Sequence, residues 1–274
     1  MADSWDPDIA ALSLTHIEKS GLQVFRNYTV AFEKSAATRF VSESNRTDYD
    51  TSKLNGILRL IVVEDIRFLS VIACSFSDEQ LEEMFKREIP RGVPGGRSSM
   101  LSGYGSLSRF SQRIQVAYAF NWIGTDILEE LDKLRKIRND TSHSWDMSSA
   151  LSKLDLLIDG HMTKIEEQLG DGIRLPERFW DDLPKEAIFR VRLIWLLGRC
   201  FYEAHLYAAA IKLRLNPQLA LYGEEKTNLL VCVAAKCLEA TKEVISATQT
   251  NLAPNTVAPA SSPPVSGKIE STAQ

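Results

Sequence analysis

Apolar positions recur at steps of three and four residues along most of this chain, and no alternating apolar and polar run is long enough to found a sheet. Such a period is typical of α-helices, because it brings the apolar side chains of successive turns to one face. The sequence therefore predicts an all-α protein built as a helical bundle. From about Ala10 to Phe40 the period is carried by apolar or small residues: Leu14, Ile17, Gly21, Val24, Tyr28 and Ala31.

Polar and turn-forming residues divide the middle of the chain into further helices. After a polar segment at 41–52, the pattern predicts a core helix from Ile57 to Phe76. Ser77 and Gln80 then fit a capping box, which predicts that a new helix begins there and runs to about Ile89. Residues 90–106 contain five glycines and two prolines and are predicted to form an irregular loop.

Two long helices are predicted in the C-terminal part of the chain, at 185–215 and 218–248, as a hairpin joined at Asn216-Pro217. The first contains a run of nineteen residues that is apolar enough to suggest a membrane span. Arg199 and Glu203 lie in the middle of that run, and charged side chains there favour a buried helix of a bundle.

Four of the ten prolines follow residue 253, in a segment without large core residues, so the tail is predicted to be disordered. We therefore expect an N-terminal helical segment at 1–53, a helical domain at 54–170, a hairpin extension at 171–249 and a disordered tail at 250–274.

Composition limits the classes of function. The chain carries 32 Lys and Arg against 36 Asp and Glu, so a globally basic nucleic-acid binder is disfavoured and a local basic patch would be needed for that role. The four cysteines lie in apolar segments without metal-ligand spacing, which indicates reduced core thiols and no metal. The acidic start MADSWDPD has no apolar signal region, which favours a cytoplasmic protein without a membrane partner.

One helix, predicted at 126–145, carries the chemistry of interest. Its apolar seam includes Arg138, and burying a guanidinium costs several kcal/mol unless carboxylates or carbonyls accept its hydrogen bonds. Arg138 therefore indicates either a structural ion pair or a ligand site. The predicted seam is Ile127, Leu131, Leu134, Arg138, Thr141 and Trp145.

A second row on the same helix consists of Arg135, Asn139 and His143 at a spacing of four residues. Arginines can clamp a phosphate and a histidine can transfer a proton near neutral pH, so these groups suit metal-free phosphodiester cleavage. The same groups could instead cap helix carbonyls and pair with acids such as Glu64 or Asp65. The residues alone leave both interpretations open.

Several motifs in order resemble the mannitol operon repressor (MltR-like) family over roughly residues 55–160. They are a turn that contains Gly105-Ser106, a helix with Arg113-Ile114 and Ala117-Tyr118, and a helix that reads LRKIRN at 134–139 before His143. The resemblance implies an all-helical cytoplasmic regulator that acts through protein partners. It also implies the absence of a DNA-reading motif, and we find no helix-turn-helix with a basic recognition helix in this sequence.

The segment from Arg138 to His143 also resembles the RNxxxH signature of HEPN-type helical domains, many of which cleave RNA. The resemblance implies that Arg138 binds the scissile phosphate, that His143 transfers a proton and that Asn139 orients one of them. In that family two motifs commonly meet across a dimer interface. The basic residues Lys133, Arg135, Lys136 and Arg138 of both copies would then attract RNA.

The leading prediction is a non-enzymatic regulatory protein of transcription that binds other proteins, as a homodimer and without a cofactor. The alternative is a metal-independent endoribonuclease, a toxin or defence protein, with Arg138, Asn139 and His143 as its catalytic residues. The predicted binding residues are Arg135, Lys136, Arg138, Asn139 and His143.

Overall fold

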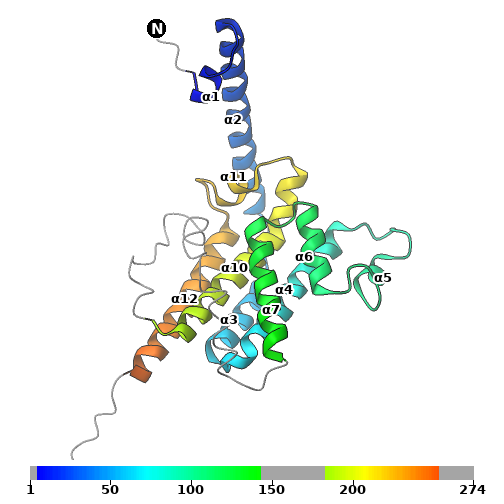
Figure 1. Ribbon diagram of the computed structural model, residues 1–274, viewed down its shortest axis with the longest axis vertical. Helices are drawn as coiled ribbons and strands as arrows, with labels where there is room; N and C mark the ends of the chain where they lie inside the picture. Colours follow the sequence, from blue (N-terminus) through cyan, green and yellow to red (C-terminus); the bar gives the residue numbers. More distant parts are fainter. Residues whose placement is uncertain (1–4, 143–182, 253–274) are drawn as a thin grey trace, which may run out of the picture.

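The computed structural model describes residues 5–142 and 183–252, and within these ranges every regular element is a helix (Figure 1). The predicted all-α class is therefore confirmed. The predicted tail at 250–274 falls almost entirely outside the described residues. The helices are α1 Pro7–Ala10, α2 His16–Ser44, α3 Ser52–Val63, α4 Ile66–Glu88, α5 Arg97–Leu101, α6 Phe110–Ala119, α7 Thr125–Ser142, α10 Lys185–Lys212, α11 Pro217–Tyr222 and α12 Asn228–Leu252.

Helix α10 lies at the centre of the bundle. It packs against α12 and α4, and also contacts α3, α7 and α11 (Figure 1). Helices α6 and α7 in turn pack against α4. One hydrophobic core runs from Phe40 at the base of α2 to Val244 on α12. The division of the chain into the four segments named above stays a prediction.

The predicted boundary at Ser77 is wrong. Helix α4 runs unbroken through Ser77, which is fully buried, and the break falls earlier, at Glu64 and Asp65. Asp65 caps α4 by accepting a hydrogen bond of 2.9 Å from the backbone N–H of Arg67. The capping-box pattern at Ser77 is overridden because the burial of that turn in the core holds the helix together.

The hairpin prediction is confirmed for its first helix and corrected for its second. The segment predicted as one helix at 218–248 is divided into α11 and α12 by a connection at 223–227. Gly223 makes the connection possible, since a Cβ there would lie 2.3 Å from the carbonyl oxygen of Leu219. Thr227, which is fully buried, then accepts a hydrogen bond of 3.1 Å from the N–H of Leu230 at the start of α12.

Helix α2 projects from the bundle as an arm, with α1 folded against it (Figure 1). A capping box of Thr15 and Glu18 begins the helix. Only the last turns bury side chains, at Ala37, Phe40, Val41 and Ser44. The helix predicted from about Ala10 is therefore correct only from His16 on, because residues 11–15 are not helical. Its apolar side chains are exposed: Leu14, Ile17, Val24 and Tyr28 all lie at the surface.

The cysteines follow the predicted pattern with one departure. Cys74, Cys200 and Cys237 are buried, and burial raises the pKa of the Cys74 and Cys200 thiols to about 12. Cys232 is half-buried on α12. None of the four cysteines forms a disulfide within the described ranges.

Candidate functional site

Helix α7 presents the predicted site residues, and its buried face differs from the predicted seam. The seam is correct at Ile127, Leu131 and Leu134, but its next buried residue is Ile137, three positions on, rather than Arg138. Because the step is three and not four, Arg138 turns to the edge of the helix, where it is half-buried. The buried arginines of the described chain are instead Arg113, Arg192 and Arg199.

Arg138 and Asn139 do lie together. The amide oxygen Oδ1 of Asn139 accepts hydrogen bonds from Nη2 of Arg138 at 2.8 Å and from Nε at 3.2 Å. Both side chains are half-buried at the C-terminal end of α7. The next turn is fixed to α4 by a hydrogen bond of 3.2 Å between the hydroxyls of Thr141 and Ser70. The end of α7 is therefore a polar edge held against α4.

The other two predicted binding residues turn toward an acid of their own helix. Nη2 of Arg135 lies 2.7 Å from Oδ1 of Asp132, and Nζ of Lys136 lies 2.9 Å from Oδ2. These two cations lower the pKa of the Asp132 carboxyl, by hydrogen bonds first from Lys136 and then from Arg135. The predicted basic patch is thus partly neutralised within α7.

His143 lies outside the described residues, as does Trp145 of the predicted seam. The structure therefore brings together two of the predicted catalytic groups, Arg138 and Asn139, and leaves the third undescribed. The suggested partner Asp65 is engaged elsewhere, since its carboxylate lies 2.8 Å from Nη2 of Arg67.

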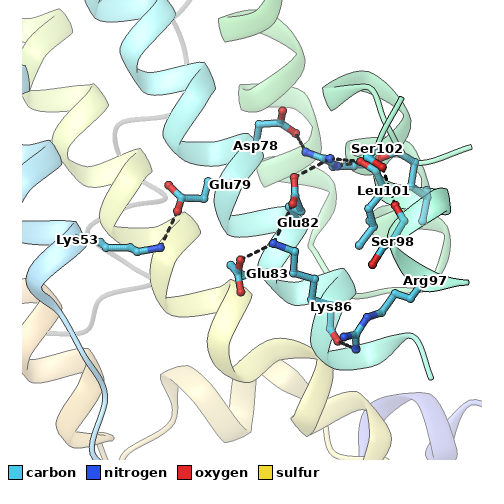
Figure 2. Close-up of polar contacts among 12 residues, drawn as sticks. Lys53, Asp78, Glu79, Glu82, Glu83, Lys86, Arg97, Ser98, Leu101 and Ser102 are labelled. Carbon is cyan, nitrogen blue, oxygen red and sulfur yellow. Dashed lines mark hydrogen bonds and ion pairs between the residues drawn. The ribbon is translucent and has the colours of Figure 1, made fainter. Parts of the chain in front are cut away.

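A carboxylate row on α4 faces α6 and the segment that precedes it, and Figure 2 shows its ion pairs. Arg113, which is buried on α6, contacts Asp78 at 2.6 Å and Glu82 at 2.8 Å. It also donates to the carbonyl oxygens of Leu101 and Leu107, at 2.9 and 2.8 Å. Arg113 therefore anchors the glycine-rich segment, which was predicted to be wholly irregular but contains the short helix α5.

The acids of this row form ion pairs with cations of the same chain. Burial is the main influence on the pKa of Asp78 and raises it, although Arg113 and Arg138 act in the opposite direction. Glu79 on the same helix pairs with Lys53 of α3 at 2.6 Å (Figure 2). Sequence reasoning missed the contacts of Arg113 with Asp78 and Glu82. The signal available in the sequence was a charged residue, Arg113, among the apolar positions of α6: Phe110, Ile114 and Ala117.

A second network was missed, in the centre of the bundle. Nε of Arg199 lies 2.7 Å from Oε1 of Glu203, one turn away on α10, and Nη2 lies 2.6 Å from Asp126 of α7. The hydroxyl of Tyr222 on α11 donates to the same Oε1 at 2.6 Å. Arg199 and Glu203 are 2% and 1% exposed. Their presence within an apolar run was the signal, but it predicted only that the run does not span a membrane.

Burial is the main influence on the pKa values of Glu203 and Tyr222 in this central network. It raises the pKa of Glu203, a shift that Arg199 opposes, and it raises the pKa of Tyr222 well above its usual value. The arrangement joins α7, α10 and α11. Arg199 and Glu203 are buried, whereas the side chain of Asp126 is 15% exposed.

Two surface pockets lie apart from α7. One has a volume of about 340 Å³ and lies between the turn that follows α2 and the start of α12, next to Tyr49 and Cys232. The other, of about 280 Å³, lies beside Arg190 and Val244. None of the described candidate residues on α7 lines either pocket. Within the described ranges no group of three His, Cys, Asp or Glu side chains could hold a metal ion, and no helix is long and apolar enough to cross a membrane.

Comparison with protein-family models, with curated proteins and with solved structures gives no match for this chain. The resemblances to the mannitol operon repressor family and to HEPN-type domains therefore rest on the sequence motifs alone.

Proposed function

We propose that this chain is a helical regulatory protein without enzymatic activity, which acts in the cytoplasm, as a homodimer, through contacts with proteins. The observation that supports contact with proteins is the exposed apolar surface of α2. Ile17, Val24 and Tyr28 are 81%, 68% and 69% exposed on a helix that projects from the bundle. Contiguous apolar surface of this kind is typical of protein contact sites in globular proteins. The resemblance of the sequence motifs to the mannitol operon repressor family supports a role in the regulation of transcription.

The polar groups of α7 agree with this proposal. Arg135 and Lys136, the cations that would serve a nucleic-acid groove, form ion pairs with Asp132 of the same helix. Ion pairs of this kind reduce the charge available for phosphates, whose binding relies on cations. We therefore assign contact with DNA to a protein partner of this chain rather than to the chain itself.

The test compares variants in a deletion strain of the native host. We expect deletion to change the levels of a set of transcripts, and we expect wild type and His143→Ala to restore them. Val24→Glu, which places a charge in the apolar surface, is expected to fail, whereas Val30→Glu on another side of α2 is expected to succeed. Transcript levels that deletion leaves unchanged would refute the regulatory proposal.

The endoribonuclease is the second candidate, and one observation favours it. The amide oxygen of Asn139 accepts two hydrogen bonds from the guanidinium of Arg138, which suits the orienting role that the resemblance to the RNxxxH motif implies for Asn139. In such a site Arg138 would hold the phosphate and His143 would transfer the proton, without a metal.

Incubation of the purified chain with labelled RNA and a chelator tests this candidate. Cleavage by wild type that is lost in His143→Ala, and retained in His16→Ala on the arm, would establish it. If both variants and wild type leave the RNA intact, the nuclease is excluded and the regulatory proposal is unaffected.

A further inference from the structure

Leu22 and Val30, 40% and 58% exposed, lie on other sides of α2. The remaining exposed apolar residues of the helix form one continuous band together with Gly21. At about 100° per residue, the residues of this band fall within an arc of roughly 120° around the helix. None of them is charged, and all of them are exposed. We call this surface the arm band; its residues are Ile17, Gly21, Val24, Phe25, Tyr28, Ala31 and Phe32.

Other elements of the chain contact the opposite side of the same helix at two places. Near the tip, Arg26 binds the carboxylates of Asp6 and Asp8 beside α1, at 2.8 and 2.6 Å. Near the base, Glu33 accepts a hydrogen bond of 2.6 Å from the N–H of Asn216, at the start of α11, and Lys34 lies 2.9 Å from Glu224.

These cation and carboxylate positions of α2 all lie on the side away from the arm band by the same helical geometry. Elements of this chain therefore hold the arm from one side at both ends. None of the described residues covers the arm band along the projecting part of the helix.

Gly21 adds a steric feature to the arm band. A Cβ at this position would have no described atom within 4 Å, so no contact among the residues that the structure describes requires a glycine there. Glycine lowers helix propensity in an exposed helix, but it allows the backbone of another helix to approach closely. The position therefore suits a helix that docks from outside.

The area of the arm band fits a second copy of the chain. Ile17, Val24, Phe25, Tyr28 and Phe32 are 59% to 81% exposed. At roughly 200 Å² for each large side chain, these five offer about 700 Å². A stable interface buries about 800 Å² per partner. A twofold interface brings each surface against its own equivalent, so a charge on that surface would oppose a like charge. The arm band carries no charge, so two identical bands meet without this repulsion.

We propose that two copies of this chain dimerise by docking their arm bands against each other. This inference rests on the proposed function, in which the apolar side of α2 is a protein contact surface, and it names the partner. Figure 1 places the arm at one end of the molecule and the C-terminal end of α7 toward the other. The dimer therefore forms independently of Arg138 and Asn139.

Light scattering after size exclusion, on the full chain at micromolar concentration, tests the proposal with a matched pair of variants. Wild type is expected at twice the 30.7 kDa chain mass. Val24→Glu is expected to raise the dimer dissociation constant at least about 100-fold, because it opposes two like charges in a dry interface. Val30→Glu makes the same change at a residue that is 58% exposed outside the arm band, and is expected to leave the dimer intact.

Hydrogen exchange gives a second measurement that does not depend on a variant. The amides of residues 17–32 are expected to gain protection as the concentration of wild type rises, whereas those of α12 do not. A wild type that is monomeric at 50 μM, or a dimer weakened equally by Val24→Glu and Val30→Glu, would overturn the docking proposal. Circular dichroism of each variant verifies that the helices remain folded.

The outcomes separate this proposal from the proposed function. A monomeric wild type whose transcript regulation still requires Val24 refutes the dimer in both proposals. It assigns the arm band to a different protein partner and leaves the proposed regulation through protein contacts unaffected. A dimer lost in Val24→Glu, with transcript levels still restored by that variant, supports docking and refutes the proposed function.

Discussion

Helices α10 and α2 are almost equal in length, 28 and 29 residues, and they use their side chains in opposite ways. In α10 nineteen residues are buried, including Arg192, Arg199 and Glu203, whereas α2 buries four and exposes Phe25, Tyr28 and Phe32. A charge in the interior costs free energy unless another charge or donor meets it, and an apolar side chain in water forgoes the gain of burial.

The two helices differ in where the compensating partner lies. The partners of Arg199 and Glu203 lie in the same chain, on α7 and α11. Folding itself therefore forms the contacts that offset the free energy of burying these charges. No part of the described chain buries the arm band, and the proposed second copy would bury it on association. Substitutions in α10 should therefore change the stability of the fold, and substitutions in the arm band should change assembly.

The largest expected effect is that of Glu203→Ala. It removes one of the two ion-pair partners of the buried Arg199, leaving Asp126, and it removes the acceptor of Tyr222, which should lower the free energy of unfolding by about 3–5 kcal/mol. Urea unfolding followed by circular dichroism measures the loss. Glu203→Gln keeps an oxygen that accepts from both partners and should lose less.

Glu186→Ala is the matched control on the same helix. It breaks the i,i+4 pair with Arg190 (2.7 Å), whose acid is half exposed to solvent, and should cost less than about 1 kcal/mol. If Glu203→Ala and Glu186→Ala have equal effects, the central network contributes no more than a surface ion pair.

A glycine-to-alanine substitution in each helix gives an effect of intermediate size and of opposite sign. A Cβ at Gly198 in α10 would lie 2.4 Å from the sulfur of Cys237, so Gly198→Ala should destabilise the fold by about 1–3 kcal/mol. At Gly21 in α2 a Cβ has open space, so Gly21→Ala should stabilise the monomer by about 0.5–1 kcal/mol through helix propensity.

Both substitutions are measured in the Val24→Glu background, so that dimerisation does not enter the unfolding free energy. Adding Cys237→Ala to Gly198→Ala should recover part of the loss, because it removes the contacting sulfur. Destabilisation by Gly21→Ala in that background would show that the arm band is packed within the chain.

The helical class could be predicted from sequence because the three- and four-residue spacing of apolar residues matches the turn of an α-helix. The period does not report what covers a helix face. The stripe through Ile17, Val24 and Tyr28 has the same spacing as a core face, yet it is exposed, and the sequence offers no signal of which element lies opposite.

The candidate site was predictable in part for the same reason. Arg138 and Asn139 are adjacent in the chain, so their contact follows from local geometry. Arg113 and Arg199 find their partners on other helices, at Asp78 and Asp126. Such pairings depend on how the helices pack, and a single sequence does not specify that.

The smallest expected effect concerns α1 and is local. Hydrogen bonds from Arg26 lower the pKa of Asp8 from 3.8 to about 2. Because the folded pKa is depressed, the attachment of α1 is complete above about pH 4 and is lost as the pH falls toward 2. Carboxyl NMR titration of Asp8 should show this value, and Arg26→Gln should return it toward 3.8.

The global unfolding midpoint should not change in Arg26→Gln, because these side chains are exposed and the core does not include α1. The dimer should also persist, since Arg26 lies on the side of α2 away from the arm band. Loss of the dimer in this variant would mean that α1 helps to form the interface, and the arm band would then extend onto that helix.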